Sequence, residues 1–239
     1  MSVNSIGGGL SIDRVMALRA QILDAYGVAT ACLLGLLSTT GASLPYPILP
    51  PLFAGVEHAG SANGLTSFLG LPPKLLFAIA LMVNPIGLLI GTAVLGSLSD
   101  RFGRRPLLLW TAAGAAVGHV LTAWALAVGS YPLFLLARFG TGLLEGQGAI
   151  VRAMLADRLE GPVRNHALSW LNGSFTLGWL FGPLLAGLTI GFGLTVPFYI
   201  AAGALLLGEA ITWQELVGGA IVILGAAISQ GQVRGRRAR

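Results

Sequence analysis

The side chains best suited to carry chemistry in this chain of 239 residues are ionisable groups that lie inside long apolar runs. Glu145 lies near the middle of one run, with Arg138 seven residues before it and Arg152 seven residues after it. Seven residues is close to two helical turns, so the three side chains are expected to project from one helix face. A carboxyl group in such a place can bind and release a proton. The alternative is a structural ion pair of Glu145 with Arg138 or a neighbour.

Two further polar residues, His119 and Asn84, fall near the middle of two earlier apolar runs. We expect Asn84, His119, Arg138 and Glu145 to meet in one polar cavity, with His119 as a proton relay. The alternative for His119 is a hydrogen-bonded packing role. The four residues form the predicted pathway for a proton and a substrate.

A charged stretch at 96–106 joins two of the apolar runs and reads Gly-Ser-Leu-Ser-Asp-Arg-Phe-Gly-Arg-Arg-Pro. Gly103 permits the backbone conformations that a reversal between two helices needs. Asp100 can accept hydrogen bonds from a helix N-terminus or from an arginine. The arginines can hold the stretch at an anionic membrane surface, so a generic basic loop is the alternative.

The composition of the chain indicates which kind of structural elements position these residues, because it is strongly apolar. Mean hydropathy is +0.81, and only 10% of residues are charged, against roughly 25% in an average soluble domain. So few charges could not cover a soluble globule, which argues against a water-soluble enzyme, and a disordered chain would be more polar. The single cysteine, Cys32, excludes a disulfide framework, and the three histidines show no metal-ligand spacing.

Apolar runs long enough to cross a bilayer, which takes about 20 residues, are expected at 26–49, 75–98, 107–128, 131–155, 166–190 and 194–208. They lack the alternation of barrel strands, so we predict an all-α polytopic membrane protein with six transmembrane helices. Twelve of the fourteen basic residues fall in the N-terminal segment, the second-to-third and fourth-to-fifth connections, and the tail. The positive-inside rule makes these segments, and therefore the N-terminus, cytoplasmic. This clustering fits a membrane protein better than a nucleic-acid partner, despite a net charge of +5.

The end of the chain leaves the number of helices open. A further apolar stretch at 211–229 can also insert, which gives seven helices and places the four-arginine tail outside, whereas six helices keep it inside. The expected division is a cytoplasmic N-terminal segment at 1–25, a transmembrane bundle at 26–205, and an atypical apolar C-terminal segment with a basic tail at 206–239.

The loop at 96–106 resembles the signature loop of the major facilitator superfamily, which joins the second and third helices of that family. The resemblance implies a conformational latch, whose aspartate and arginines contact neighbouring helix ends in one state and release them in the other. It gives those roles to Asp100 and Arg104. Asp157 and Arg164 match the acidic and basic positions that flank the fourth-to-fifth connection. The latch residues implied in this way are Gly96, Asp100, Arg101, Gly103, Arg104, Arg105, Asp157 and Arg164.

Two more segments carry the same resemblance, which covers about residues 26–205. Residues 138–146 look like the fourth helix of the family, with an intramembrane arginine followed by spaced glycines. The fifth run resembles the antiporter motif of drug/proton exchangers, including the tetracycline-efflux type, with Ala186 in place of one glycine. Small residues allow helices to approach closely, and proline can bend a helix. The predicted helix-packing residues are Gly178, Gly182, Pro183 and Gly187.

Residues 205–220 resemble a different family, the drug/metabolite transporter superfamily. A leucine run ends in Gly208 and Glu209, and a short loop and a glycine-rich helix follow, as in the last two helices of those proteins. A facilitator's sixth helix would instead lead into a long cytoplasmic loop and six more helices. The resemblance suggests a fused, frameshifted or engineered end.

The resemblance implies the N-terminal six-helix half of a facilitator, built from two inverted three-helix repeats, in a bacterial inner membrane. The expected function is secondary active transport, as proton-coupled efflux of a small organic molecule. The expected partners are the lipid bilayer, the substrate, protons, and either a second half-transporter chain or a second copy. No enzyme activity, cofactor or metal is expected, because no nucleophile–base pair or ligand cluster occurs. The alternatives are a truncated or fused half with no transport of its own, and a complete small transporter of another kind.

Overall fold

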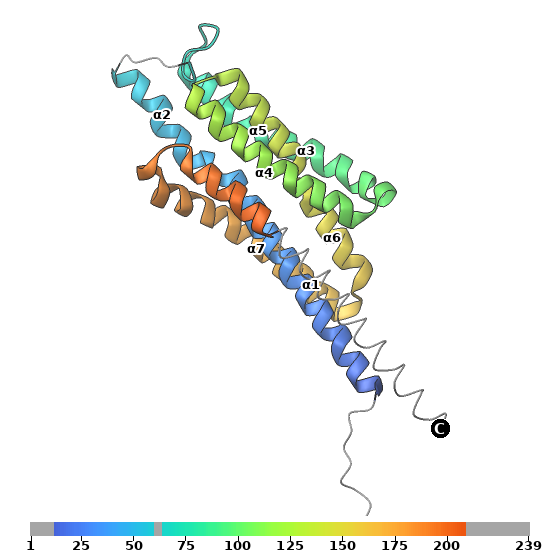
Figure 1. Cartoon of the computed structure of the whole chain (residues 1–239). Helices are drawn as coiled ribbons and strands as arrows, with labels where there is room; N and C mark the ends of the chain where they lie inside the picture. The colour runs from blue at the N-terminus through green and yellow to red at the C-terminus, as the bar shows by residue number, and fades with distance from the viewer. Residues whose placement is uncertain (1–11, 60–63, 209–239) are drawn as a thin grey trace, which may run out of the picture.

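The computed structural model describes residues 12–59 and 64–208, and every regular element in these ranges is a helix (Figure 1). The helices are α1 (Ile12–Ser43), α2 (Pro45–Ala59), α3 (Pro73–Phe102), α4 (Arg104–Val128), α5 (Tyr131–Glu145), α6 (Gln147–Arg158), α7 (Gly161–Thr189), the 3-10 turn η1 (Ile190–Phe192) and a last helix at Val196–Gly208. No strand occurs within these ranges, and the predicted all-α class is confirmed.

Four stretches of the described chain are long and apolar enough to cross a membrane. They are Gly27–Ala54, Pro73–Phe102, Arg104–Val128 and Gly161–Phe192. The helix at Val196–Gly208 corresponds to the predicted sixth span. The predicted stretch at 211–229, and with it the choice between six and seven helices, lies outside the described residues.

The predicted fourth span, 131–155, is not one continuous helix, because the chain breaks between α5 and α6 at Gly146. The backbone angles there are φ −62° and ψ 3°. A Cβ at Gly146 would lie 2.7 Å from the carbonyl carbon of Gly91 on α3, so no side chain fits at the break. A second break, at Leu44, divides the first span into α1 and α2. Pro45 begins α2 and has no backbone N–H with which to continue α1.

Two helix pairs organise the bundle, α1 with α7 and α3 with α5 (Figure 1). α4 packs against α5, so that α3, α5 and α4 form one group. The last helix joins this group, since Ala202 and Leu205 pack with Ala115 and Ala116 of α4. Each pair contains one of the two breaks: the break at Leu44 ends α1, and the break at Gly146 ends α5.

Glycines bring α3 and α5 into backbone contact. Gly87 and Gly91 on α3 face Gly142 and Gly146, and each pair is spaced by four residues, as in a small-xxx-small contact between membrane helices. A Cβ on Gly91 would overlap the carbonyl oxygen of Leu143. The side chains that flank these glycines are thus held at a fixed separation between the two helices.

In the α1–α7 pair, glycines of α7 lie against hydroxyl side chains of α1. A Cβ on Gly178 would overlap the hydroxyl of Thr39, and one on Gly182 would overlap the hydroxyl of Ser43. The Ser43 hydroxyl also donates a hydrogen bond of 3.3 Å to the carbonyl oxygen of Gly178. Gly187 differs from the other packing candidates, because it is exposed and a Cβ there would meet open space.

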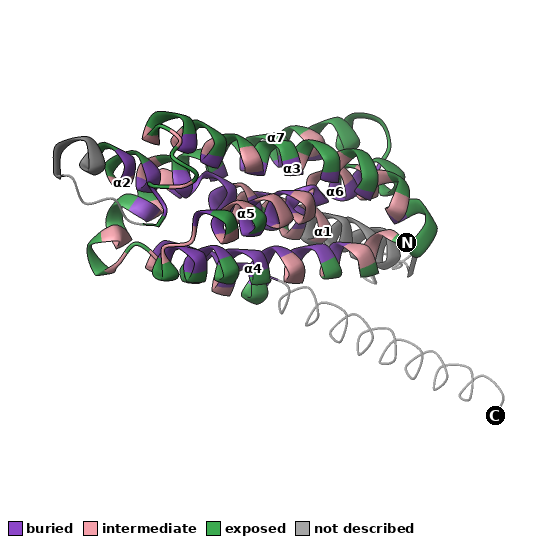
Figure 2. Cartoon of the chain, turned by 90° about the horizontal axis from the view of Figure 1, so that it is seen from above, coloured by how far each residue is buried: buried purple, intermediate pink, exposed green. Residues whose placement is uncertain are grey.

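Large apolar side chains cover much of the outer surface of the bundle, where a soluble protein would carry charges. Figure 2 shows the exposed faces along the outer sides of the helices and the buried residues between them. Trp110, Trp170, Leu89 and Leu136 are among the most exposed of these apolar side chains. A surface of this kind is stable against lipid hydrocarbon rather than water, as expected for an integral membrane protein.

Candidate functional site

The four predicted pathway residues converge inside the bundle from three helices. Asn84 comes from α3, His119 from α4, and Arg138 and Glu145 from α5. Each is at most 4% exposed. Burial of polar and charged groups is costly unless they are paired, so the contacts among these side chains determine what the cluster can do.

Glu145 is the centre of this buried cluster. The amide nitrogen of Asn84 donates a hydrogen bond of 3.0 Å to Glu145 Oε2. His119 Nε2 lies 3.2 Å from Glu145 Oε1, which is within ion-pair distance, although the geometry is not that of an aligned hydrogen bond. The two carboxylate oxygens therefore face two different helices, α3 and α4. Gly41 of α1 packs against the Nε2 edge of the His119 ring, since a Cβ there would overlap that edge.

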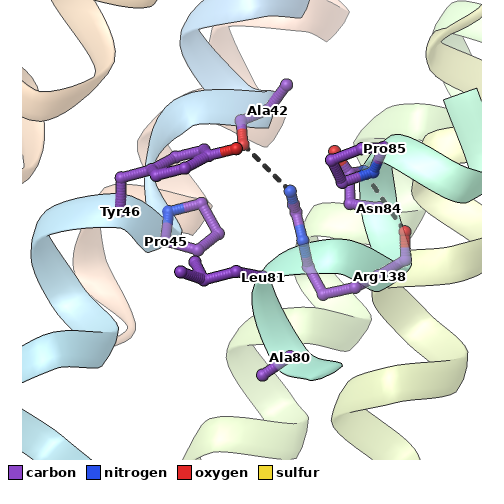
Figure 3. Close-up of a pocket in the computed structure, with 8 residues that line it drawn as sticks. All are labelled: Ala42, Pro45, Tyr46, Ala80, Leu81, Asn84, Pro85 and Arg138. Atoms are coloured by element: carbon purple, nitrogen blue, oxygen red, sulfur yellow. Dashed lines mark hydrogen bonds between the residues drawn. The ribbon is translucent and has the colours of Figure 1, made fainter. Parts of the chain in front are cut away.

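Arg138 lies in the same region but is anchored to α1 (Figure 3). Its guanidinium donates a hydrogen bond of 3.0 Å to the carbonyl oxygen of Ala42. Ala42 lies in the last turn of α1, where carbonyls lack their normal helical partners. Asn84 also donates to the backbone carbonyl of Arg138, at 3.2 Å. Within the described residues Arg138 forms no ion pair with Glu145 inside 4.0 Å, so the partner of the carboxylate is His119.

Several buried polar atoms of the cluster have no hydrogen-bond partner among the described residues. They are His119 Nδ1 and Nε2, Arg138 Nε and Nη1, Glu145 Oε1, and both amide atoms of Gln147. Buried polar atoms are nearly always paired in a resting structure, so unpaired ones in one region indicate a place where protons, water or substrate groups bind. Gln147 was not predicted from sequence, and its position two residues after Glu145 was the only available signal.

A small pocket opens beside Arg138, lined by Ala42, Pro45, Tyr46, Ala80, Leu81, Asn84, Pro85 and Arg138 (Figure 3). The Tyr46 ring stands on one side of it and packs edge-on against Trp179 of α7, with ring centroids 5.5 Å apart. The break between α1 and α2 places Tyr46 here. Nothing in the sequence pattern singled out Tyr46, because its role depends on that break.

The predicted latch residues form a second charged cluster at one end of the bundle. Arg104 lies 2.8 Å from Asp157 on α6 and 3.3 Å from Asp100 on α3. Gly103 allows this arrangement, because its φ of +87° turns the chain directly from α3 into α4. The Arg104 side chain thus bridges the loop between α3 and α4 to the end of α6.

The other predicted latch residues are less involved. Arg101 and Arg164 are exposed and form no ion pair with a described residue, and a Cβ at Gly96 would meet open space. Arg105 is partly buried. The structure therefore brings together Asp100, Arg104 and Asp157 out of the eight positions.

Arg152 departs from the expected common face with Arg138 and Glu145. It lies on α6, beyond the break at Gly146, and its side chain is exposed. Its guanidinium is directed toward α7, where it contacts Asn172. In the described residues no group of three or more His, Cys, Asp or Glu side chains could hold a metal ion.

Comparisons with known families and with known sequences both find membrane transport proteins. The family profile described as Major Facilitator Superfamily matches residues 31–219. Tetracycline resistance protein, class B, of Escherichia coli is 32% identical over 172 residues, which cover 72% of this chain and 39% of that protein. The chain thus spans about two-fifths of the length of this relative.

Two solved structures have a similar fold. The human organic anion transporter MFSD10 (TETRAN) superposes with a TM-score of 0.59 at 26% identity, over 77% of this chain and 46% of that one. The proton:xylose symporter XylE superposes with a TM-score of 0.62 over 80% of this chain and 45% of that one. At 17% identity, the second similarity concerns the fold alone.

Proposed function

The chain belongs to the major facilitator superfamily, and from this premise we propose that it acts in proton-coupled efflux of a small organic molecule across a bacterial inner membrane. Its tetracycline-resistance relatives and the antiporter-like pattern around Gly178 and Gly182 support export rather than uptake. The clustering of arginines supports a cytoplasmic N-terminus. We further propose that residues 26–205 form the transport bundle and pair with a second bundle, from another chain or a second copy.

The observation that carries this proposal is the buried carboxyl group of Glu145. A carboxylate removed from water is costly, so it persists only with partners or by taking up a proton. Glu145 has both options, because Asn84 donates to one oxygen and the other oxygen faces His119 at 3.2 Å. Two groups that can hold a proton therefore lie in direct contact at the centre of the bundle.

Exchange follows from competition for the same groups. When Glu145 is ionised, it attracts the His119 ring and the fixed positive charge of Arg138. When a proton binds to Oε1, these attractions weaken, and Arg138 retains only its hydrogen bond to the Ala42 carbonyl. A substrate group that binds Arg138 or Asn84 favours one of these two states. Substrate arrival then displaces the proton toward His119, and a returning proton displaces the substrate.

The cluster at the end of the bundle supplies the conformational step in this proposal. Arg104 connects α3, through Asp100, to the end of α6, through Asp157. When the cytoplasmic side opens, these helix ends separate and the bridge breaks. The bridge is largely exposed, so breaking it costs little and can be repeated in each transport cycle.

Transport by the purified full chain in proteoliposomes, with radiolabelled tetracycline as the probe and an imposed pH gradient, tests the proposal. Glu145→Gln should abolish gradient-driven accumulation and keep downhill exchange, because glutamine preserves the shape and removes the titratable group. The matched control is Glu160→Gln, the same change at an exposed position, which should accumulate the probe as the unmodified chain does. Unchanged accumulation in Glu145→Gln would assign Glu145 a structural role, and no accumulation by the unmodified chain would contradict transport by this chain alone.

A further inference from the structure

Helix α7 has a polar face that is open to its surroundings although the helix is long enough to span a membrane. Asn165, Ser169, Asn172 and Thr176 are all exposed, and their spacing of four, three and four residues places them on one side of the helix. The hydroxyls of Ser169 and Thr176 donate hydrogen bonds to the backbone carbonyls of Asn165 and Asn172, at 2.9 and 3.0 Å. This set of four residues is called the α7 polar face below.

A second exposed face of the same helix is apolar. It carries Trp170, Leu177, Phe181, Leu184 and Leu188, whereas the buried side, with Gly178 and Gly182, faces α1. The apolar face suits lipid hydrocarbon, and the α7 polar face does not, since amides in hydrocarbon are costly. The α7 polar face is therefore better suited to a water-accessible path than to lipid.

Arg152 reaches this path from α6. Its guanidinium donates a hydrogen bond of 3.2 Å to Asn172 Oδ1, and its central carbon lies 5.0 Å from the centroid of the Phe175 ring. Phe175 is wedged between helices, because a Cβ on Gly35 of α1 or Gly148 of α6 would press against the ring. A cation–π contact with a ring held in this way fixes the guanidinium in one orientation.

No described residue neutralises the charge of Arg152. In the described part of the chain no carboxylate lies within 4.0 Å of it; Asp157, on the same helix, is paired with Arg104, and Glu145 is buried beside His119. Arginine presents five donors in a planar fork, and the protein uses one of them here. An oriented, unneutralised guanidinium on a polar path is suited to a planar oxyanion.

We propose that Arg152, together with the side-chain amide of Asn172, forms a binding subsite for the carboxylate or a similar oxyanion of an organic substrate. The subsite rests on the proposed transport function and gives it a substrate class, organic anions. It lies seven residues along the chain from Glu145, beyond the break at Gly146, so the substrate anion and the transported proton bind at separate places.

A pair of matched probes tests the subsite. Equilibrium binding to the purified full chain in lipid nanodiscs would be measured for a fluorescent aromatic carboxylate and for its methyl ester, which differ only in charge. The unmodified chain should bind the carboxylate about tenfold more tightly than the ester. Arg152→Gln should remove that preference and leave ester binding unchanged, and Arg152→Lys should keep part of it, because lysine retains the charge but loses the planar fork. Arg158→Gln, at another exposed arginine of α6, is the control and should keep the full preference.

The outcomes separate the subsite from the transport proposal. Equal binding of the two probes by the unmodified chain would overturn the anion subsite while leaving transport standing, and so would a full carboxylate preference in Arg152→Gln. Loss of preference in both Arg152→Gln and Arg158→Gln would also overturn it, because the preference would then come from general positive charge. Binding of neither probe would overturn the subsite and count against transport as well.

Discussion

Two charged clusters in this molecule use the same chemical groups, a carboxylate and a nitrogen base, in opposite surroundings. The buried cluster has Glu145 with a side chain 1% exposed, whereas Asp100 and Asp157 of the surface bridge are 66% and 60% exposed. Where the effective dielectric constant is low, a change of protonation greatly alters the interaction energy between neighbouring charges. In water the same change alters that energy only slightly. The comparison teaches that burial decides how strongly each carboxylate depends on its partners: strongly for Glu145, and weakly for Asp100 and Asp157.

The buried cluster depends on the glycine contact between α3 and α5, which gives the first and largest prediction. Gly91→Leu should abolish the folded protein, because even a Cβ at Gly91 overlaps the backbone of Leu143. Gly187→Leu, at an exposed glycine with open space around it, should leave the protein folded. Size-exclusion profiles after detergent extraction would distinguish the two. A monodisperse Gly91→Leu protein would show that the cluster does not need this contact.

The second prediction is that removing one carboxylate destabilises the protein more in the buried cluster than in the surface bridge. Glu145→Ala should lower the free energy of unfolding by about 2 kcal/mol or more, since Asn84 and His119 lose a buried partner. Asp157→Ala should lower it by less than about 1 kcal/mol, as for an exposed pair. Equilibrium unfolding in mixed micelles would measure both. Equal losses of unfolding free energy in the two variants would contradict the view that Glu145 is buried and Asp157 is exposed.

The contact between His119 and Glu145 should appear as a coupling energy. In a double-mutant cycle of His119→Leu and Glu145→Leu, the double variant should be more stable than the sum of the single effects predicts, by about 0.6–1.7 kcal/mol. Replacing both groups removes the unpaired polar atom that each single change leaves behind. The same cycle should give the same value at low and high salt. If the two single effects add, the contact of 3.2 Å between His119 and Glu145 does not contribute to stability.

The corresponding cycle for the surface bridge should give a smaller and salt-sensitive value. Arg104→Gln combined with Asp157→Asn should show a coupling of about 0.2–1 kcal/mol at low salt. Because exposed charges are screened, the coupling should vanish toward 1 M salt, where the screening length is about 3 Å. A coupling that persists at high salt would place this bridge in the same class as the buried cluster.

The smallest expected effect on stability is that of Asp100→Asn. The midpoint of thermal unfolding should not change measurably, because Asp100 is the more distant of the two Arg104 partners, at 3.3 Å, and is mostly exposed. Tetracycline transport in proteoliposomes should nevertheless slow, because the latch loses one of its two contacts. A variant that is absent from the membrane would instead identify Asp100 as a folding residue.

The sequence was sufficient to predict the helical class and to choose the buried polar residues. An ionisable side chain inside an apolar run is so costly that it marks an interior position by itself, as at Glu145 and Arg138. The partners could not be read in this way. Arg138 binds the Ala42 carbonyl beside the break at Leu44. Pro45 is a local signal for that break, but which side chain of another helix reaches the carbonyl depends on tertiary packing, which no local pattern encodes. Likewise the break at Gly146 arises from the approach of α3, and it turned Arg152 away from the face that helical periodicity predicted.

The hydrogen bond between Arg138 and the Ala42 carbonyl has a genetic consequence. Its acceptor belongs to the backbone, so replacing the side chain of residue 42 leaves the acceptor in place. A suppressor screen for an Arg138 variant should therefore find no compensating change of residue type at position 42. Compensation would have to come from changes that shift the end of α1, such as moving the proline at position 45. A change of side chain can therefore remove this hydrogen bond directly only at Arg138 on α5, and not at residue 42 on α1.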